Sequence, residues 1–258
     1  MKATIALPLL AGLASSTPLD LQERQSCPSV YVFGARETTV GPGYGTSQGL
    51  VNMVVQAYPG AGSEPITYPA CGGQSSCGGI SYDQSATQGT AAVVKAVTDL
   101  NARCPDTKIA LIGYSQVCPC MQGYSSRIST KRGLEPFALS ANTSELLQGG
   151  QIMDNALCGG AGATLTGNAL AAVKVAIFMG DPHNTVGLPY NVGTCQAGGF
   201  AARPSGFQCT PGSPTIIQSY CDAADPYCCN GNDANTHQQY VNKYGQQALT
   251  FIKGKLDA

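Results

Sequence analysis

The segment Lys108-Ile109-Ala110-Leu111-Ile112-Gly113-Tyr114-Ser115-Gln116 decides the fold of this chain. Its first five residues, a lysine followed by four apolar residues, indicate a buried strand, and Gly-x-Ser-x follows directly. This is the first part of a nucleophile elbow, in which a strained turn raises the serine hydroxyl above the sheet and the next backbone N–H faces the developing oxyanion. The segment therefore predicts Ser115 as a nucleophile and Gln116 as an oxyanion donor. A serine in an ordinary turn is the alternative, but the preceding strand favours the elbow.

Patterns on either side of this segment predict strands that alternate with helices. Apolar runs indicate strands over 30–33, 65–68, 173–179 and 214–220, and apolar residues at helical spacing indicate helices over 47–57, 83–104 and 236–256. Such alternation predicts an α/β fold whose mostly parallel sheet is covered on both faces. In such sheets the chemistry gathers at the carboxyl ends of the strands.

The first residues are typical of a targeting segment. A lysine, an apolar run of about a dozen residues and small residues behind it predict a signal peptide over 1–16, and a pro-segment over 17–25. The run is too short to cross a bilayer, which needs about 20 residues. We therefore expect a secreted, extracellular protein with one domain over 26–258. Only 11% of residues are charged and the net charge is -1, so we expect no nucleic-acid or membrane partner.

Twelve cysteines behind a secretion signal predict disulfides formed in an oxidising compartment. A zinc site is the alternative. It is disfavoured because the cysteines are scattered, no paired Cys-x-x-Cys modules occur and the chain has only two histidines. We expect no metal and no cofactor.

A nucleophilic serine needs a general base, and the two histidines of this chain, His183 and His237, are the candidates. In α/β-hydrolases the order along the chain is serine, acid, histidine, so His237, on a loop before the last helix, fits and His183 does not. Two aspartates lie between cysteines upstream of His237, and bridged cysteines would hold such a carboxylate loop rigid. We predict Asp225 as the acid that orients His237, with Asp222 as the near alternative.

Four stretches of the chain resemble fungal acetyl xylan esterases of the cutinase-like carbohydrate esterase family 5. They are Gly34-Ala35-Arg36-Glu37-Thr38-Thr39, the segment from Tyr68 to Gly79, Gly113-Tyr114-Ser115-Gln116 and the segment from Cys221 to Cys229. The resemblance covers nearly all of 26–256 apart from one block. It implies a three-layer α/β-hydrolase without a lid, a Ser115–Asp225–His237 triad, and an activity that removes acetyl groups from acetylated xylan.

The resemblance also implies further roles. Thr38 matches the hydroxyl residue that forms the oxyanion hole together with the Gln116 N–H, and Tyr227 matches an aromatic residue that narrows the site. Cys27 is expected to pair with Cys104, and Cys71 with Cys77. We expect a monomer. Two alternatives stay open: a cutinase-like or general short-chain esterase, and a non-catalytic product of a faulty gene model.

The block that the resemblance does not cover is 117–148, and it interrupts the elbow. A nucleophile elbow has glycine two residues after the serine, where this chain has Val117. Removing 117–148 joins Gln116 to Gly149 and restores the motif. The block also holds two cysteines (118 and 120), whose removal leaves ten of the twelve, and the only glycosylation sequon, at Asn142.

We hypothesise that 117–148 is a retained intron translated in frame. Codons for Val117-Cys118 permit a GT-A-TGT start, and the Gln148 codon permits a CAG end. A genuine lid-like insertion is the alternative, but insertions usually enter at loop tips. A spliced transcript that still encodes the block would end the intron hypothesis. In the chain as written we expect little or no esterase activity, because the helix after Gln116 would lose its anchoring glycines and two extra cysteines could mispair.

Overall fold

A computed structural model describes residues 27–115, 148–209 and 214–258. The predicted signal peptide (1–16) and pro-segment (17–25), Gln116, the two cysteines of the block and Asn142 lie outside the described residues. The elements are β1 (Val30–Ala35), η1 (Gly45–Ser47), α1 (Gln48–Ala57), β2 (Gly62–Pro65), η2 (Ser75–Cys77), α2 (Tyr82–Arg103), β3 (Lys108–Tyr114), α3 (Gln148–Cys158), α4 (Gly167–Ala172), β4 (Val173–Met179), β5 (Asn191–Val192), η5 (Pro214–Ile216), β6 (Ile217–Tyr220), α5 (Ala234–His237) and α6 (Tyr240–Leu256).

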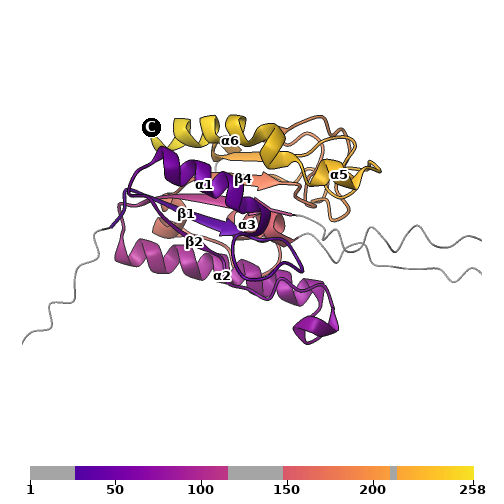
Figure 1. Cartoon of the computed structure of the whole chain (residues 1–258), viewed down its shortest axis with the longest axis horizontal. Helices are drawn as coiled ribbons and strands as arrows, with labels where there is room; N and C mark the ends of the chain where they lie inside the picture. The colour runs from indigo at the N-terminus through magenta and orange to yellow at the C-terminus, as the bar shows by residue number, and fades with distance from the viewer. Residues whose placement is uncertain (1–26, 116–147, 210–213) are drawn as a thin grey trace, which may run out of the picture.

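One six-stranded sheet, in the order β2-β1-β3-β4-β6-β5, forms the centre of the described structure, and all five strand pairs in it are parallel. Helices α1 and α6 lie over one face and α2 over the other (Figure 1). This is the three-layer α/β arrangement that the alternating pattern predicts. Because every strand runs the same way, the carboxyl ends of β3, β4 and β6 meet at one edge of the sheet.

Alternate residues of β3 face the two helical layers. Ile109 and Leu111 belong to the core formed with α2 and α3, whereas Ala110 and Ile112 belong to the core formed with α1 and α6. All four are fully or almost fully buried. A strand covered on both faces needs apolar side chains at every position, which is why the β3 sequence is a continuous apolar run rather than an alternating one.

Helix α2 is the clearest helix of the sequence and the structure confirms it. Ser81 caps its first turn, since the serine side chain accepts the Gln84 N–H while the Gln84 side chain accepts the Ser81 N–H. The residues at helical spacing, Ala86, Val93, Val97 and Leu100, are all buried.

Three elements differ clearly from the sequence prediction. The strand expected over 214–220 begins only at Ile217, because Pro214–Ile216 forms the short helix η5. The strand expected over 65–68 lies at Gly62–Pro65 instead, because the carbonyls of Ile66 and Tyr68 accept hydrogen bonds from Arg36 rather than from a strand. The closing helix expected over 236–256 is two helices, α5 and α6, with a break at 238–239. His237 therefore ends a short helix and does not lie on a loop.

All ten cysteines in the described part of the chain are in disulfides. Both pairs that the resemblance implied, Cys27–Cys104 and Cys71–Cys77, are bonded, and three further bonds join Cys158–Cys209, Cys195–Cys229 and Cys221–Cys228. Sulfurs in disulfides are not thiolate ligands, so the pairing agrees with the disulfide interpretation over zinc. No helix in the described ranges combines the length and apolarity that a membrane crossing needs.

Candidate active site

Ser115 follows the carboxyl end of β3, where it is fully buried and its N–H donates to the Met179 carbonyl at 2.9 Å. Its hydroxyl oxygen accepts the N–H of Gly150, the third residue of α3, at 3.0 Å. A serine that accepts the third N–H of a helix is in the position of an N-cap. The elbow is therefore assembled from two segments, one ending at Ser115 and one beginning at Gln148.

Glycines permit this close approach of strand and helix. A Cβ on Gly113 would lie 2.8 Å from the Cα of Gly150, and a Cβ on Gly149 would lie 2.6 Å from the Arg36 carbonyl oxygen. Real Cβ atoms essentially never come within 3.0 Å of such atoms. Only glycine fits at both positions, which is the packing that an elbow requires.

This arrangement changes one expectation from the sequence. Gln148, placed there at the end of the interruption, begins α3 and is fully buried in the site, in the position expected for Gln116. Because both residues are glutamine, removing 116–147 or 117–148 leaves the same sequence. The expectation that α3 would lose its anchoring glycines is wrong, since Gly149 and Gly150 pack against the elbow.

His237 and Asp225 meet beside the serine. The His237 Nδ1 lies 2.5 Å from the Asp225 Oδ2, and both side chains are fully buried. The other carboxylate oxygen of Asp225 accepts the backbone N–H groups of Tyr227 at 2.7 Å and Cys228 at 3.2 Å. A rigid cradle, closed by the Cys221–Cys228 disulfide, therefore fixes the carboxylate that faces the imidazole.

Asp222, the alternative acid, faces elsewhere. Its carboxylate forms an ion pair with Lys243 at 2.6 Å and accepts the hydroxyls of Thr194 and Tyr244 at 3.0 and 2.8 Å. Burial raises the pKa of Asp222, but these hydrogen bonds outweigh burial and hold its pKa below the ordinary value. The structure thus brings Asp225, and not Asp222, to His237.

Gly180 keeps the imidazole close to the serine. It has a φ of +68°, and a Cβ there would lie 2.9 Å from the His237 Nδ1 and 3.0 Å from the Ser115 carbonyl oxygen. The imidazole and the Ser115 backbone therefore both contact one glycine. The His237 Nε2, the nitrogen a base would use, is buried and accepts no hydrogen bond from the described residues. Hydrogen bonds between a catalytic base and its nucleophile are often long or poorly aligned before substrate binds.

Thr38 and Tyr227 complete the set of expected residues. Thr38 is fully buried, and its hydroxyl has no hydrogen-bond partner among the described residues. It lies in the loop after β1, next to the Ala35 and Arg36 carbonyls that contact Gly149. The Tyr227 ring packs edge-on against His237, with 4.8 Å between ring centroids.

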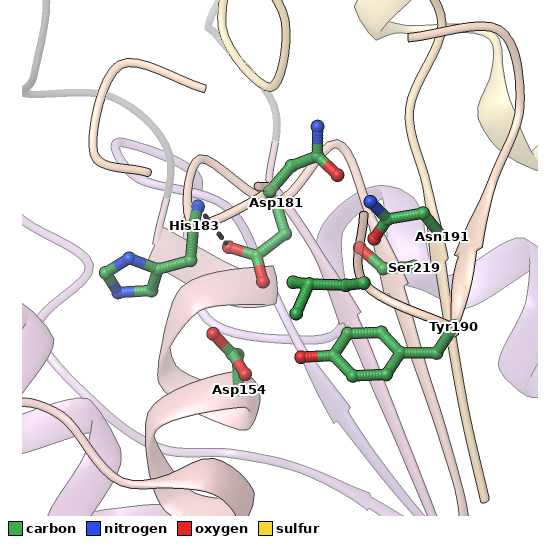
Figure 2. A pocket seen from close by; sticks show the side chains of 8 residues that line it. Asp154, Asp181, His183, Tyr190, Asn191 and Ser219 are labelled. Atoms are coloured by element: carbon green, nitrogen blue, oxygen red, sulfur yellow. Dashed lines mark hydrogen bonds between the residues drawn. The ribbon is translucent and has the colours of Figure 1, made fainter. Parts of the chain in front are cut away.

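His183 lies in a separate cluster behind the site. Its Nδ1 is 2.7 Å from the Ala201 carbonyl oxygen and not against a triad acid, so it does not join the triad, and burial lowers its pKa. The cluster surrounds a cavity of about 10 Å³, in which Asp154, Asp181 and Tyr190 converge (Figure 2). This volume is about enough for one water molecule and far too small for a substrate. Burial and the nearby Asp154 raise the pKa of Asp181 well above its usual range.

Sequence reasoning missed the residues that hold His237 in place. Tyr240 donates to the Asp225 Oδ2 at 2.6 Å, and Tyr114 donates to the His237 carbonyl at 2.8 Å. Tyr114 is the variable residue of the Gly-x-Ser-x motif, and Tyr240 lies three residues after the histidine. Nothing in their spacing indicates these contacts, although Gly180 could have been found from the Gly-Asp-Pro that follows a strand.

The chain is similar to known proteins over almost its full length. Residues 26–136 and 146–256 match the model of the cutinase family. "Cutinase 11" of Verticillium dahliae is 53% identical over 97% of this chain and 76% of its own length, and "Acetylxylan esterase 2" of Talaromyces purpureogenus is 50% identical over 96% of both. The solved catalytic core domain of acetyl xylan esterase from Trichoderma reesei is 51% identical, with a TM-score of 0.73, over 89% of this chain and 99% of that one.

Proposed function

The chain belongs to the cutinase family, and on this premise we propose that it removes acetyl groups from acetylated xylan with a Ser115–His237–Asp225 triad. Its sequence is 50–51% identical to those of acetylxylan esterases, and the chain is therefore a carboxylic ester hydrolase. The observation that supports the triad is the fully buried contact of 2.5 Å between His237 and Asp225, with the imidazole and the Ser115 backbone both lying against Gly180.

The proposed reaction has two halves. His237 takes the proton of the Ser115 hydroxyl as its oxygen attacks the acetyl carbonyl carbon, and the collapse of the tetrahedral intermediate returns that proton to the sugar oxygen as it leaves. Water then attacks the acetyl-serine while His237 takes a proton from it, and as the second intermediate collapses the bond to the Ser115 oxygen breaks, that oxygen takes the proton back from His237, and acetate departs. Asp225 holds the imidazole by Nδ1 and stabilises its cation, while its own hydrogen bonds keep the carboxylate in place.

The tetrahedral oxyanion requires donors fixed before the reaction begins. We assign this role to the Thr38 hydroxyl and to the backbone N–H of Gln148, which begins the helix at the elbow. Thr38 suits the task because its buried hydroxyl is not used by any other described residue. Loss of one such donor costs about 10² to 10³ in rate.

Acetyl esters are favoured over longer acyl esters because Tyr227 packs beside the imidazole and narrows the site. The relatives' names divide between acetylxylan esterase and cutinase, so a cutinase-like or general short-chain esterase is the second candidate. Initial rates on acetylated xylan and on p-nitrophenyl acetate, butyrate and palmitate separate the two. Turnover that rises with acyl length would contradict the acetyl preference.

Secretion and a monomeric state belong to the same proposal. An oxidising compartment is needed to form the five disulfides, which agrees with a signal peptide over 1–16 and a pro-segment over 17–25. N-terminal sequencing of protein from the culture medium tests the cleavage points, and light scattering tests the monomer.

The assignment of Ser115 is tested by covalent labelling. An ethyl phosphonate ester should attach to the Ser115 oxygen and stop the hydrolysis of p-nitrophenyl acetate, and S115A should neither react nor turn over. H237A and D225N should fold, and each should lower kcat by at least about 10³-fold. A label on another serine would rule out the triad, and a chain that takes no label would support the non-catalytic alternative.

The interruption has a different expected effect from the one the sequence suggests. Because Gln148, Gly149 and Gly150 stand in the elbow, the chain as written should show measurable turnover. The contiguous form without 117–148 should be faster, since a peptide bond then fixes the donor next to Ser115. Parallel assays of both forms test this, and equal rates would show that the covalent connection is unimportant.

A further inference from the structure

We propose that Ser85, on helix α2, is a positioning residue that holds the two halves of the oxyanion hole together through the Ala70–Cys71 peptide. The inference rests on the proposed function, because it concerns the Thr38 and Gln148 donors assigned there. Ser85 touches neither the triad nor either donor group. Its hydrogen bonds nevertheless join the segments on which both donors lie.

The first half of the connection is a closed ring of hydrogen bonds around Gln148. The Ser85 hydroxyl donates to the Gln148 Oε1 at 2.7 Å and accepts the Cys71 N–H at 2.9 Å. The Gln148 Nε2 donates back to the Cys71 carbonyl at 2.8 Å and also to the Tyr82 carbonyl at 3.0 Å. Ser85 and Gln148 are fully buried, so no water can replace a lost partner without a cavity to hold it.

The second half joins the same peptide to the Thr38 loop. The Ala70 carbonyl accepts the N–H of Thr39 at 2.7 Å, one residue after the Thr38 hydroxyl. Thr39 and Ala70 have φ angles of +66° and +53°, and they are the only non-glycine residues with positive φ in the described chain. Such backbone persists where surrounding contacts over-determine it, and here it lies on both sides of one hydrogen bond.

Two neighbouring groups reinforce the Thr38 loop. The buried Arg36 side chain donates to the carbonyls of Val40, Ile66 and Tyr68, and its guanidinium lies 4.8 Å from the centre of the Tyr68 ring. Tyr68 in turn donates its hydroxyl to the Arg36 carbonyl at 2.6 Å. The loop is thus fixed from its own side, and the Ala70–Cys71 peptide is the link that sets its position relative to Gln148.

Removal of the Ser85 hydroxyl breaks this link at one point. The Cys71 N–H and the Gln148 Oε1 would both lose their partner, so Gln148 would be held only by the two hydrogen bonds of its Nε2 and less accurately than before. The donors should then sit less accurately around the oxyanion, which exists only in the transition state. We therefore expect kcat to fall with little change in KM.

The experiment compares two buried hydroxyls of the same helix in the full chain. S85A should lower kcat for p-nitrophenyl acetate by about 10- to 100-fold and leave KM within about twofold. The control is T90V, which removes a fully buried hydroxyl whose one hydrogen bond within the described residues is to the Ala86 carbonyl of its own helix at 2.8 Å. T90V should lower thermal stability comparably and leave kcat unchanged. If S85A does not fold, S85C, which keeps the volume and a weak donor, replaces it.

A second readout reports on the oxyanion hole itself. Methylboronic acid adds to the serine oxygen and places a negatively charged oxygen among the donors, so its Kd should rise in S85A by the same factor by which kcat falls. S85A with the kcat and boronate Kd of T90V would overturn the positioning role and leave the esterase assignment intact. An unsubstituted chain that neither turns over nor takes the boronate would overturn both.

Discussion

Gly149 is the residue whose substitution tests the assembled elbow most directly. An added Cβ would lie 2.6 Å from the Arg36 carbonyl oxygen, 2.7 Å from that of Ala35 and closer still to that of Tyr114. All three atoms are backbone, so none can rotate away as a side chain could. The start of α3 would have to move away from the elbow by about an ångström, and overpacking of this kind costs about 1–3 kcal/mol.

Two quantities should change in G149A. The melting temperature should fall by about 2–12 °C, since each kcal/mol shifts Tm by about 2–4 °C in a domain of this size. The kcat for p-nitrophenyl acetate should fall about 10²-fold or more, because a displacement of 1 Å at a reacting centre has an effect of that order. Calorimetry and initial-rate kinetics on the full chain measure both.

Gly254 supplies the matched control. It is also a helical glycine, in α6, but no atom outside the backbone of its own turn of helix and its chain neighbours lies within 4 Å of its added Cβ. G254A should therefore leave kcat unchanged and raise stability by up to about 1 kcal/mol, the helix-propensity difference between glycine and alanine. If G149A keeps the kcat and Tm of the unsubstituted chain, Gly149 does not stand in the elbow of the chain as written, and the reasoning is refuted.

Three further predictions concern the surroundings of the triad and the frame of the fold. Y240F removes a hydrogen bond of 2.6 Å to the acid of the triad, so kcat should fall about tenfold and stability by about 1.5–3 kcal/mol, measured by kinetics and urea unfolding. K243Q should lower the unfolding free energy by about 1 kcal/mol at pH 7, since Lys243 is half exposed. The pKa of its partner Asp222 is lowered in the fold, so the stabilisation by this ion pair is present above about pH 4 and is lost as pH falls through the folded pKa of Asp222. If K243Q were still less stable than the unsubstituted chain by the same amount at pH 2, this explanation would be wrong. The double substitution C27S/C104S removes a disulfide between residues 77 apart in the sequence and should lower the free energy of unfolding by about 4 kcal/mol. An unchanged urea midpoint would show that this disulfide does not stabilise the fold.

The sequence by itself was enough for the layers of the fold. Continuous apolar runs at 109–112 and 175–179 predict buried parallel strands, and the spacing of Ala86, Val93, Val97 and Leu100 predicts one long helix with a single buried face. These patterns are local, because each depends only on which face of a single helix or strand is buried. The chain order of serine, acid and histidine follows from the same one-dimensional information.

The sequence did not place the contacts among segments far apart in the chain. It could not choose between Asp222 and Asp225 by spacing, because only their opposite directions on one disulfide-closed loop bring one to the imidazole and the other to Lys243. It assigned Ile66 and Tyr68 to a strand, whereas Arg36 takes their carbonyls. It also placed Gln148 outside the site, and the ring of hydrogen bonds with Ser85 and Cys71 puts it inside. Which polar group meets which is decided only when the strands converge, because a buried hydrogen bond needs both partners within about 3 Å, and no local pattern encodes that distance.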